Sequence, residues 1–257
     1  MKLEGPIGEV QRRMAQTKEG MSRRNSTFQA LDVRVGQRIL ALGCGGGFLL
    51  RELALAVGPE GEAVGIDPSQ DQIDAANILC HDLENVTLVT GSATQMAFET
   101  ASFDSVASIQ VLEYIEDVSS AIKEARRVLK AGGRFASVSV LWDHWRFHGP
   151  ENPLNDRMHD AFKAHCHHQN LPLSLGTLLE QEGFVGIHET PMGFLNTSLH
   201  QNAFAYFASE MITRFAGSQG ITENEIEEWR SQLIQSEKDG RFGFVSMPVL
   251  TTAVAKS

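Results

Sequence analysis

Short apolar segments alternate with segments of helical periodicity between about residue 37 and residue 140. This alternation is typical of βαβ units, in which a helix crosses over between two parallel strands and covers one face of the sheet. Five strands are expected in this part of the chain, at Arg38–Leu42, Ala63–Ile66, Val86–Thr90, Ser105–Ile109 and Arg134–Val140. The sequence therefore predicts an α/β fold with helices on both faces of a mostly parallel sheet.

Helix signals separate these expected strands. Residues 48–57, FLLRELALAV, have helical apolar spacing and stop at Gly58-Pro59. The segment from Ser69 to Gln72 has the form of a capping box and predicts the start of the next helix. Asp117–Lys130 carries apolar residues on one helical face, and a glycine turn then leads into the fifth strand.

The strand–helix rhythm is expected to stop after residue 140. Residues 141–172 hold two of the three Trp and six of the nine His, and we interpret them as a lid. A core helix at Ser174–Glu182 and strands at Phe184–Thr190 and Phe244–Ala255 complete the expected core. The segment between these two strands, residues 194–240, has helical patterns and is interpreted as a second excursion from the same core.

Charge and composition restrict the partners of this chain. The sequence has 22 basic and 32 acidic side chains and a formal charge of −10, which disfavours a nucleic acid partner because phosphate contacts need clustered Lys and Arg. The longest nearly apolar stretch, Ile39–Leu50, is shorter than the roughly 20 residues of a membrane span, and no secretory signal is seen. Three separated cysteines predict neither a disulfide framework nor a thiolate metal site. We therefore expect a cytoplasmic protein with no membrane span.

A glycine-rich loop, Gly43-Cys44-Gly45-Gly46-Gly47, lies between the first expected strand and the first helix. Missing side chains there let backbone N–H groups approach a ligand. Asp67 closes the second strand 20 residues after the loop, where a carboxylate can accept both hydroxyls of an adenosine ribose. The alternative to this ribose-binding role is that Asp67 is only the N-cap of the next helix. A nicotinamide site requires G-x-G-x-x-G, and Phe48 stands in place of the third glycine, so this cofactor is disfavoured.

Five blocks resemble, in order, the class I S-adenosylmethionine-dependent methyltransferases: RILALGCGGGFL, AVGIDPSQDQIDAA, VTGSATQMAF, FDSVASIQVLEYIED and RRVLKAGGRF. The resemblance is greatest to the small-molecule branch that includes the ubiquinone and menaquinone methyltransferases. It implies a Rossmann-like seven-stranded sheet with a final antiparallel strand, helical lid insertions, and S-adenosylmethionine as cofactor with S-adenosylhomocysteine as product. It also implies an arm or helix over the cofactor site at residues 1–30, a methyltransferase domain at 31–257, and a substrate cap formed by the insertions 141–172 and 194–240.

The resemblance assigns cofactor-binding residues as well. The loop glycines would lie against the methionine part of the cofactor, Asp67 would hold the ribose, and Ser92 would lie at the adenine. The full set expected at the cofactor is Arg24, Ala41, Gly43, Cys44, Gly45, Gly47, Asp67, Pro68, Gln72, Ser92, Ala93, Gln110 and Leu112. Arg23 and Arg24 either pair with the cofactor's carboxylate or form a solvated arm. Two positions depart from the family's pattern: Ala41 stands where an acid usually holds the cofactor's ammonium group, and Ser92 replaces an acid at the adenine.

Candidates for the acceptor side come from the lid and the second insertion. A general base is needed only if the acceptor must lose a proton, and histidine suits that task near neutral pH. His144 and His148, one helical turn apart, with Asp143 as an orienting or basic group, are therefore the catalytic candidates, and a surface or packing role is the alternative. Tyr114 and the aromatic residues of the second insertion either pack or form the wall of an apolar acceptor pocket.

We expect a methyltransferase that moves a methyl group to an oxygen, nitrogen or carbon atom of a small organic molecule. A protein that binds the cofactor without transferring methyl is the alternative, which Ala41 and Ser92 motivate.

No metal is expected, because the neighbouring side chains of His165-Cys166-His167-His168 cannot converge on one ion. Arsenite is disfavoured as acceptor, since few cysteines lie outside the glycine loop. A homodimer is left open, because apolar lid residues are equally suited to covering a second subunit.

Overall fold

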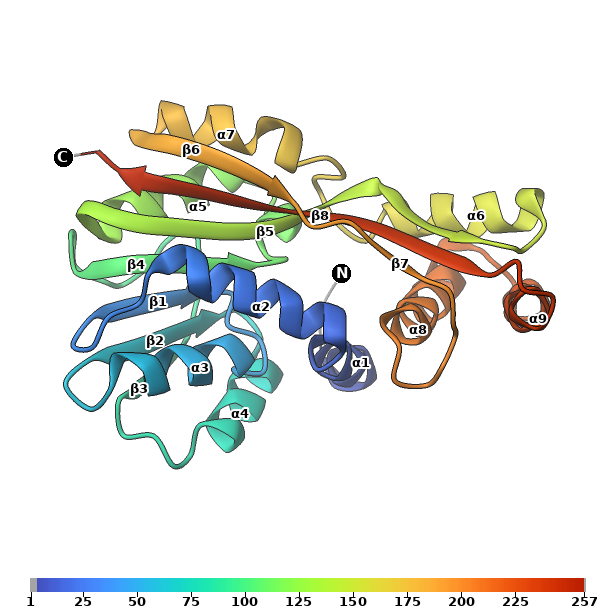
Figure 1. The fold of residues 1–257 in the computed structure, drawn as a ribbon, viewed down its shortest axis with the longest axis horizontal. Helices are drawn as coiled ribbons and strands as arrows, with labels where there is room; N and C mark the ends of the chain where they lie inside the picture. Colours follow the sequence, from blue (N-terminus) through green and yellow to red (C-terminus); the bar gives the residue numbers. More distant parts are fainter. Residues whose placement is uncertain (1–3, 257) are drawn as a thin grey trace.

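The computed structural model describes residues 4–256, which form an eight-stranded mixed sheet with surrounding helices (Figure 1). The strands are β1 (Arg38–Leu42), β2 (Glu62–Asp67), β3 (Val86–Thr90), β4 (Phe103–Ile109), β5 (Leu129–His148), β6 (Phe184–Pro191), β7 (Phe194–Asn196) and β8 (Gly243–Ala255). Their order is β3-β2-β1-β4-β5-β8-β6, and β7 pairs with β8 outside this order. Neighbours among β1 to β5 are parallel, whereas β8 runs antiparallel between β5 and β6. The α/β fold and the final antiparallel strand are thus confirmed.

The predicted number of seven strands is wrong by one. The additional strand, β7, has only three residues and pairs antiparallel with β8 through Leu195 and Val245. It lies inside the insertion 194–240, for which the sequence predicts helices at Ala203–Phe215 and Ile221–Glu237 and no strand. Three residues are too few for an alternating pattern to be recognised, because strand prediction depends on periodicity over at least four.

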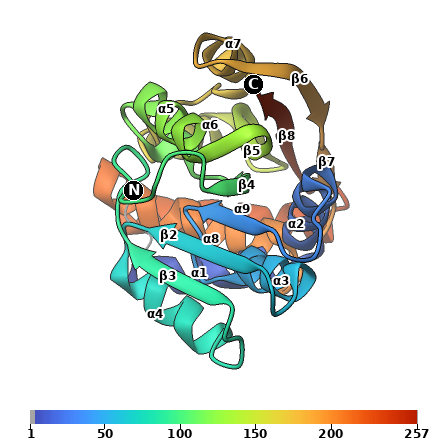
Figure 2. The same ribbon diagram turned by 90° about the vertical axis from the view of Figure 1, so that its left-hand side faces the viewer.

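Helices cover both faces of the sheet, as predicted (Figure 2). They are α1 (Gly5–Ala15), α2 (Lys18–Leu31), α3 (Phe48–Val57), α4 (Gln70–Leu79), α5 (Val118–Val128), α6 (Asn152–Lys163), α7 (Pro172–Gln181), α8 (Phe204–Ala216) and α9 (Glu223–Lys238). On one face, α2 and α3 bury Leu31, Leu50 and Leu53. On the other face, α5 and α7 bury Ile122 and Leu175. Two apolar cores therefore enclose the central strands and fix the positions of the loops that follow them.

Strands β5 and β8 continue beyond the sheet as a long antiparallel ribbon, which the sequence does not predict. The expected fifth strand ends at Val140, whereas β5 extends to His148. The register shifts between Leu141 and Arg146, so the buried positions in this part of β5 do not alternate strictly. Because of this irregularity, residues 141–148 lack the alternation of apolar and polar residues by which a strand is recognised in a sequence. Residues 141–148 are therefore a strand, and α6 follows them in the predicted lid.

The far end of this ribbon carries its own core. Helices α6, α8 and α9 pack there, and their buried side chains meet Trp145 and Phe147 of β5 and Phe244 of β8. The Phe147 ring lies 5.2 Å from that of Trp229 in α9, in an edge-to-face arrangement. Such aromatic pairs add to the stability that their burial supplies. The two excursions thus form one helical cap on the ribbon.

The N-terminal segment consists of two helices, α1 and α2, which connect the sheet to the cap. Thr17 caps α2, because its Oγ1 accepts a hydrogen bond from the backbone N–H of Gly20 at 3.2 Å. Helix α2 packs against β4 and β5, while α1 lies against α8 of the cap. Residues 4–31 therefore lie beside the loops that follow the parallel strands. Among the described residues, no helix combines the length and the apolar character needed to cross a bilayer.

Candidate active site

The glycine loop between β1 and α3 has a backbone that only glycine tolerates at its ends. Gly43 and Gly47 have φ values of 65° and 84°, in the left-handed region. A Cβ atom on Gly43 would lie 2.3 Å from the Val111 side chain, and one on Gly47 would lie 2.9 Å from Cβ of Ala76. The loop is also fixed to β2, because the backbone N–H of Cys44 donates to the carbonyl of Ile66 at 3.0 Å.

Asp67 holds this loop from the end of β2. Its Oδ2 accepts a hydrogen bond from the backbone N–H of Gly45 at 2.9 Å, and its Oδ1 accepts one from the N–H of Ser69 at 3.0 Å. The side chain is buried, and this burial raises the pKa of the Asp67 carboxyl, while the two backbone hydrogen bonds oppose the rise. The N-cap of α4 is Ser69, not Asp67. The alternative prediction, that Asp67 is only a helix N-cap, is therefore wrong.

A cavity of about 420 Å³ lies beside Asp67. Its lining includes eight of the residues predicted at the cofactor: Gly43, Gly45, Asp67, Pro68, Gln72, Ser92, Ala93 and Gln110. Val111, Tyr114 and Ile115 form much of the remaining apolar wall, together with Ile66. The cavity thus combines apolar side chains with one buried carboxylate and exposed loop backbone. That combination is typical of sites for small molecules.

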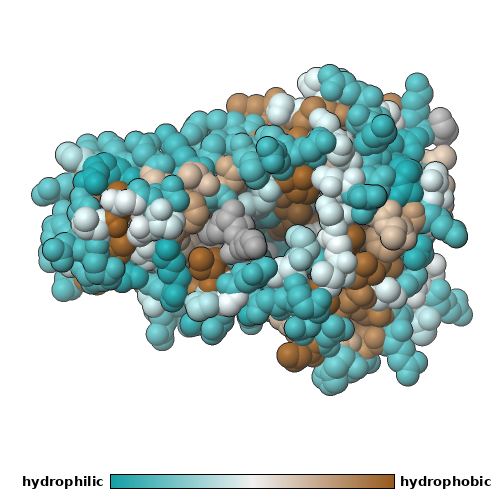
Figure 3. All heavy atoms as spheres, turned by 180° about the vertical axis from the view of Figure 1, so that it is seen from behind, coloured by the Kyte–Doolittle hydropathy of each residue, from teal (hydrophilic) through white to brown (hydrophobic). Residues whose placement is uncertain are grey.

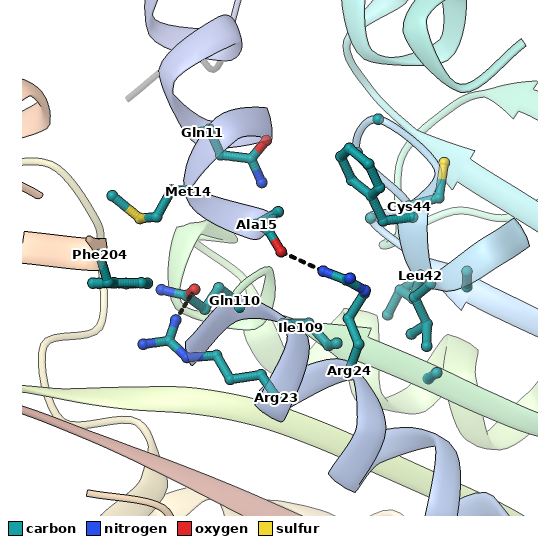
Figure 4. A pocket seen from close by; sticks show the side chains of 18 residues that line it. Gln11, Met14, Ala15, Arg23, Arg24, Leu42, Cys44, Ile109, Gln110 and Phe204 are labelled. Carbon is teal, nitrogen blue, oxygen red and sulfur yellow. Dashed lines mark hydrogen bonds between the residues drawn. The ribbon is translucent and has the colours of Figure 1, made fainter. Parts of the chain in front are cut away.

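A second cavity, of about 100 Å³, shares Gly43, Gly45 and Gln110 with the first. It lies between the glycine loop and the N-terminal helices, and Figure 4 shows Arg23, Arg24 and other lining side chains around it. The predicted cofactor residues that line it are Arg24, Ala41, Gly43, Cys44, Gly45 and Gln110. Seen from behind, the surface is hollowed between the part that holds the sheet and the helical cap, and apolar residues border this hollow (Figure 3).

Two neighbouring arginines of α2 point to different sides of this second cavity (Figure 4). Arg24 bonds through Nε to Glu52 at 2.9 Å, and its Nη1 donates to the carbonyl of Ala15. Its guanidinium lies over the Phe48 ring, beside the glycine loop. Arg23 is almost completely buried, and its Nη1 donates to Oε1 of Gln110.

Gln110, directly after β4, has a φ of 53°, which is uncommon for a residue with a side chain. Its backbone N–H donates to the carbonyl of Val138 at 2.7 Å, and its side chain accepts the hydrogen bond from Arg23. These bonds hold the strained backbone in place. Strained backbone conformations of this kind are found most often at functional sites, where the surrounding structure maintains them.

Comparison with known proteins identifies the part of the chain that builds these cavities. Residues 40–137 match the family described as Methyltransferase domain. Demethylmenaquinone methyltransferase from Staphylococcus aureus is 39% identical over 110 residues, which are 43% of this chain and 46% of that protein. Residues 40–137 form a class I S-adenosylmethionine-dependent methyltransferase domain. The predicted family is thereby confirmed.

Other relatives extend this comparison beyond the methyltransferase domain. An uncharacterised 37.1 kDa protein of transposon Tn4556 from Streptomyces fradiae is 37% identical over 130 residues, which are 51% of this chain and 38% of that protein. The chain thus spans less than half the length of these curated relatives. The solved YcgJ protein of Bacillus subtilis has a TM-score of 0.64 at 18% identity, with 92% of this chain and 99% of that chain covered. Haemonchus contortus phosphoethanolamine N-methyltransferase 2 gives a TM-score of 0.61 at 19% identity, with 93% and 53% covered. These two likenesses show the fold.

Two residues predicted at the cofactor of the methyltransferase domain line neither cavity. The Leu112 side chain is fully buried in the core below the site, and Val111 lines the larger cavity instead. Gly47 lets α3 approach Ala76 of α4 closely. Both residues act on the packing around the site in this structure. The resemblance places Leu112 beside the methionine part of the cofactor, but the chain enters a 3-10 turn there and the Leu112 side chain is buried in the core instead.

The predicted catalytic residues also lie away from the two cavities. Asp143, His144 and His148 are exposed on the outer part of β5 and line neither cavity. The expectation that the two histidines lie one helical turn apart is wrong, because β5 is extended there. Asp143 accepts a hydrogen bond from Nδ2 of Asn170 at 2.7 Å. The structure therefore does not bring these three residues to the glycine loop.

The histidine run of the lid has a packing role. His165 stacks on Phe162 with 4.0 Å between ring centroids, and burial lowers the pKa of His165 to about 4. The backbone N–H groups of His167 and His168 donate to the carbonyl of Glu113. Among residues 4–256, no three His, Cys, Asp or Glu side chains are grouped as metal ligands would be.

Sequence reasoning missed Gln11 and Met14 of α1, which line the smaller cavity. Gln11 also lines the larger one, and its Oε1 is buried without a hydrogen-bond partner among the described residues. Neither residue belongs to a motif, and both are far from the glycine loop along the chain, so the sequence does not indicate that they reach the site. Only the packing of α1 against α4 and α8 brings them to the site.

Proposed function

We propose that this chain is an S-adenosylmethionine-dependent methyltransferase that acts on a small organic molecule. The observation that carries the proposal is the buried Asp67 carboxylate, which bonds to the glycine loop and lines a cavity formed by that loop. When bound, the cofactor supplies an electrophilic methyl group on a sulfonium. Small-molecule acceptors are also supported by the names of relatives, which include a demethylmenaquinone methyltransferase and a geranyl diphosphate C-methyltransferase.

The residues present fit this cofactor. Each oxygen of Asp67 accepts one backbone hydrogen bond and retains capacity for a ribose hydroxyl. Ser92 and Ala93 line the same cavity and would contact the adenine. Pro68 and Gln72 line this end of the cavity too. Gly43 and Gly45, shared by both cavities, would lie along the methionine part.

Gln11 fits the position that Ala41 leaves without an acid. Ala41 lines the smaller cavity and is buried among apolar side chains, so it offers no acceptor for the cofactor's ammonium group. The Oε1 of Gln11 is a buried acceptor without a described partner, and Gln11 lines the same cavity. A buried acceptor that lacks a partner is costly, and a ligand that donates to it removes this cost. We therefore assign the ammonium group to Gln11.

This chain's own contribution to the transfer is to position the acceptor and exclude water. Methyl transfer is an in-line displacement, for which orientation and a dry site supply much of the acceleration. Helices α1, α2 and α8 cover the smaller cavity, and Phe204 of the cap lines it. The cap insertions 141–172 and 194–240 are accordingly proposed as the acceptor side. A general base is required only for acceptors that must lose a proton.

The test combines binding with transfer. S-adenosylmethionine and S-adenosylhomocysteine are expected to raise the melting temperature, whereas NADH is not. The protein is then incubated with methyl-labelled cofactor and a small-molecule extract, and label is expected in an extract component. Binding without transfer across broad extracts would favour a silent cofactor-binding protein, and stabilisation by NADH alone would contradict the proposal. A cytoplasmic location and a homodimer stay predictions.

A further inference from the structure

Arg23 is a cation in an almost completely buried position. Only 3% of its surface is exposed. Its Nη1 donates to the neutral amide of Gln110, while Nε and Nη2 have no hydrogen-bond partner among residues 4–256. Burying a charge is costly unless it is paired and hydrogen-bonded. This side chain therefore has two in-plane donors that the described protein groups do not use.

The surroundings of Arg23 keep it charged but do not pair it. Burial lowers the pKa of the Arg23 guanidinium to about 10, and the charges of Glu113 and Glu19 oppose this change. Neither acid forms an ion pair with it. Glu19 accepts a hydrogen bond from Asn196 at 2.7 Å, and Glu113 accepts one from the backbone of Val140 at 3.3 Å. Arg23 is thus cationic at neutral pH.

The guanidinium of Arg23 lies over two aromatic rings of the cap. Its Cζ lies 4.7 Å from the centroid of the Phe204 ring and 5.7 Å from that of Phe194. Contacts of a cation with ring faces contribute modest cation–π stabilisation, but the rings accept no conventional hydrogen bond from the unpartnered Nε and Nη2. Phe204 also lines the smaller cavity, as Arg23 does. The donors thus belong to a site with apolar walls.

We propose that Arg23 binds an oxyanion of the methyl acceptor, so that the acceptor is a small molecule with an apolar body and an ionised oxygen. The two unused donors fit the geometry of bidentate contact with such a group. The oxyanion is that of a carboxylate or of a phenol. This inference rests on the proposed function, because it concerns the second substrate of the same site.

The position of Arg23 favours the acceptor over the cofactor's carboxylate. Both aromatic rings that Arg23 contacts belong to the second insertion, Phe194 in β7 and Phe204 in α8. Its neighbour Arg24 instead contacts Phe48 and Glu52 of α3, next to the glycine loop. Arg24 therefore lies on the cofactor side and Arg23 on the cap side. One helix thus presents one cation to each substrate.

The experiment measures the binding of matched anionic and neutral probes by titration calorimetry, with S-adenosylhomocysteine at saturation. For a carboxylate the pair is 4-nitrobenzoate and 4-nitrobenzamide. For a phenol the pair is 4-nitrophenol, at a pH at which it is ionised, and 4-nitroaniline. At least one anion is expected to bind about 10- to 100-fold more tightly than its neutral partner, the range of a charge-assisted hydrogen bond. The pair that shows this preference identifies the source of the oxyanion.

Variants assign the preference to Arg23. Arg23→Met removes the charge with a similar side-chain length and is expected to abolish the preference for the anion. Arg23→Lys keeps the charge without the bidentate edge and is expected to retain part of it, which covers the case in which the Met variant does not fold. Arg13→Met is the control, because Cζ of Arg13 lies 5.0 Å from the centroid of the Phe207 ring in a similar cation–π contact and Arg13 lines neither cavity. It is expected to preserve the preference.

Three outcomes would overturn the inference: neither anion binds more tightly than its neutral partner, the preference persists in Arg23→Met, or Arg23→Met loses S-adenosylhomocysteine instead. The last result would place Arg23 at the cofactor. Each of them leaves the proposed function intact, provided that the wild type binds S-adenosylhomocysteine. Failure of that first titration in the wild type would instead contradict the proposed function itself.

Discussion

Asp67 joins the loops after two neighbouring strands, since its Oδ2 accepts the backbone N–H of Gly45 at 2.9 Å while its Oδ1 accepts that of Ser69. The carboxylate therefore holds the glycine loop against the start of α4. It also lines the larger cavity with capacity for further hydrogen bonds. One residue thus supports the loop and faces the site where we place the ribose.

Replacement of this carboxylate is expected to weaken cofactor binding. Asp67→Asn removes the charge and one of the acceptors, so the affinity for S-adenosylhomocysteine should fall about 10- to 100-fold. The measurement is the ligand-induced rise in melting temperature over a concentration series. Asp74→Asn, at an exposed position of α4, is the control and should match the wild type. An unchanged affinity in Asp67→Asn would remove Asp67 from the binding site.

A methyl group on Gly43 is expected to damage the site through Val111. The added Cβ would lie 2.3 Å from the Val111 side chain, so Gly43→Ala should lower the free energy of unfolding by about 1–3 kcal/mol and impair cofactor binding. Gly36→Ala is the control, because it shares a positive φ but has open space around its Cβ. Adding Val111→Ala should recover part of the loss. Equal unfolding energies for Gly43→Ala and Gly36→Ala, measured in urea, would argue against the close approach.

Gln11 and position 41 are expected to be coupled. Gln11→Ala should weaken cofactor binding about tenfold in the wild type, because it removes the acceptor that we assign to the ammonium group. Ala41→Asp should tighten binding, and Gln11→Ala should then cost less in that background. A double-mutant cycle measured by calorimetry reports this coupling. Gln16→Ala, an exposed residue after α1, is the control. Strict additivity of the two changes would contradict the assignment.

The stability of the protein is expected to fall between about pH 4.5 and pH 7 because of Glu113. This side chain is fully buried, and burial raises the pKa of its carboxyl to about 7 from 4.5. The folded state then binds a proton that the unfolded state has released, so the free energy of unfolding decreases as pH rises through this range. The loss is about 3 kcal/mol for a shift of this size.

Urea unfolding at about pH 5 and pH 7.5 tests this expectation for Glu113. Glu113→Gln should remove most of the pH dependence, because the amide does not titrate. Glu116→Gln, an exposed neighbour, should leave it unchanged. The same pH dependence in the wild type and in Glu113→Gln would show that other groups cause it.

The central strands were predictable because burial on both faces leaves continuous apolar segments in the sequence. Arg38–Leu42 has the predicted bounds, and the helix after the glycine loop is found at Phe48–Val57. The edge strand Val86–Thr90 also has the predicted bounds, although its residues are only partly buried or exposed. The cofactor side of the site was predictable for a related reason. In this fold the loops that follow the parallel strands hold the ligand, so motif residues such as Asp67 and Gln110 fall at the cavity.

The acceptor side depends on packing between distant segments, which local patterns do not report. The bulged outer part of β5 carries exposed His144 and His148 away from the cavities, although their chemistry suits catalysis. Arg23 gives the opposite case, because a charged residue is ordinarily expected at the surface. Its burial arises only where α2 meets β7 and α8 of the cap. Gln11 reaches the site in the same way, from α1.

Titration of the wild-type chain with S-adenosylhomocysteine, followed by calorimetry, measures directly whether the glycine loop and Asp67 form a cofactor site. We expect saturable binding of one molecule per chain, and the same titration with NADH should give no heat of binding. Absence of binding by the S-adenosyl compound, or saturable binding of NADH in its place, would show that this site does not hold the proposed cofactor.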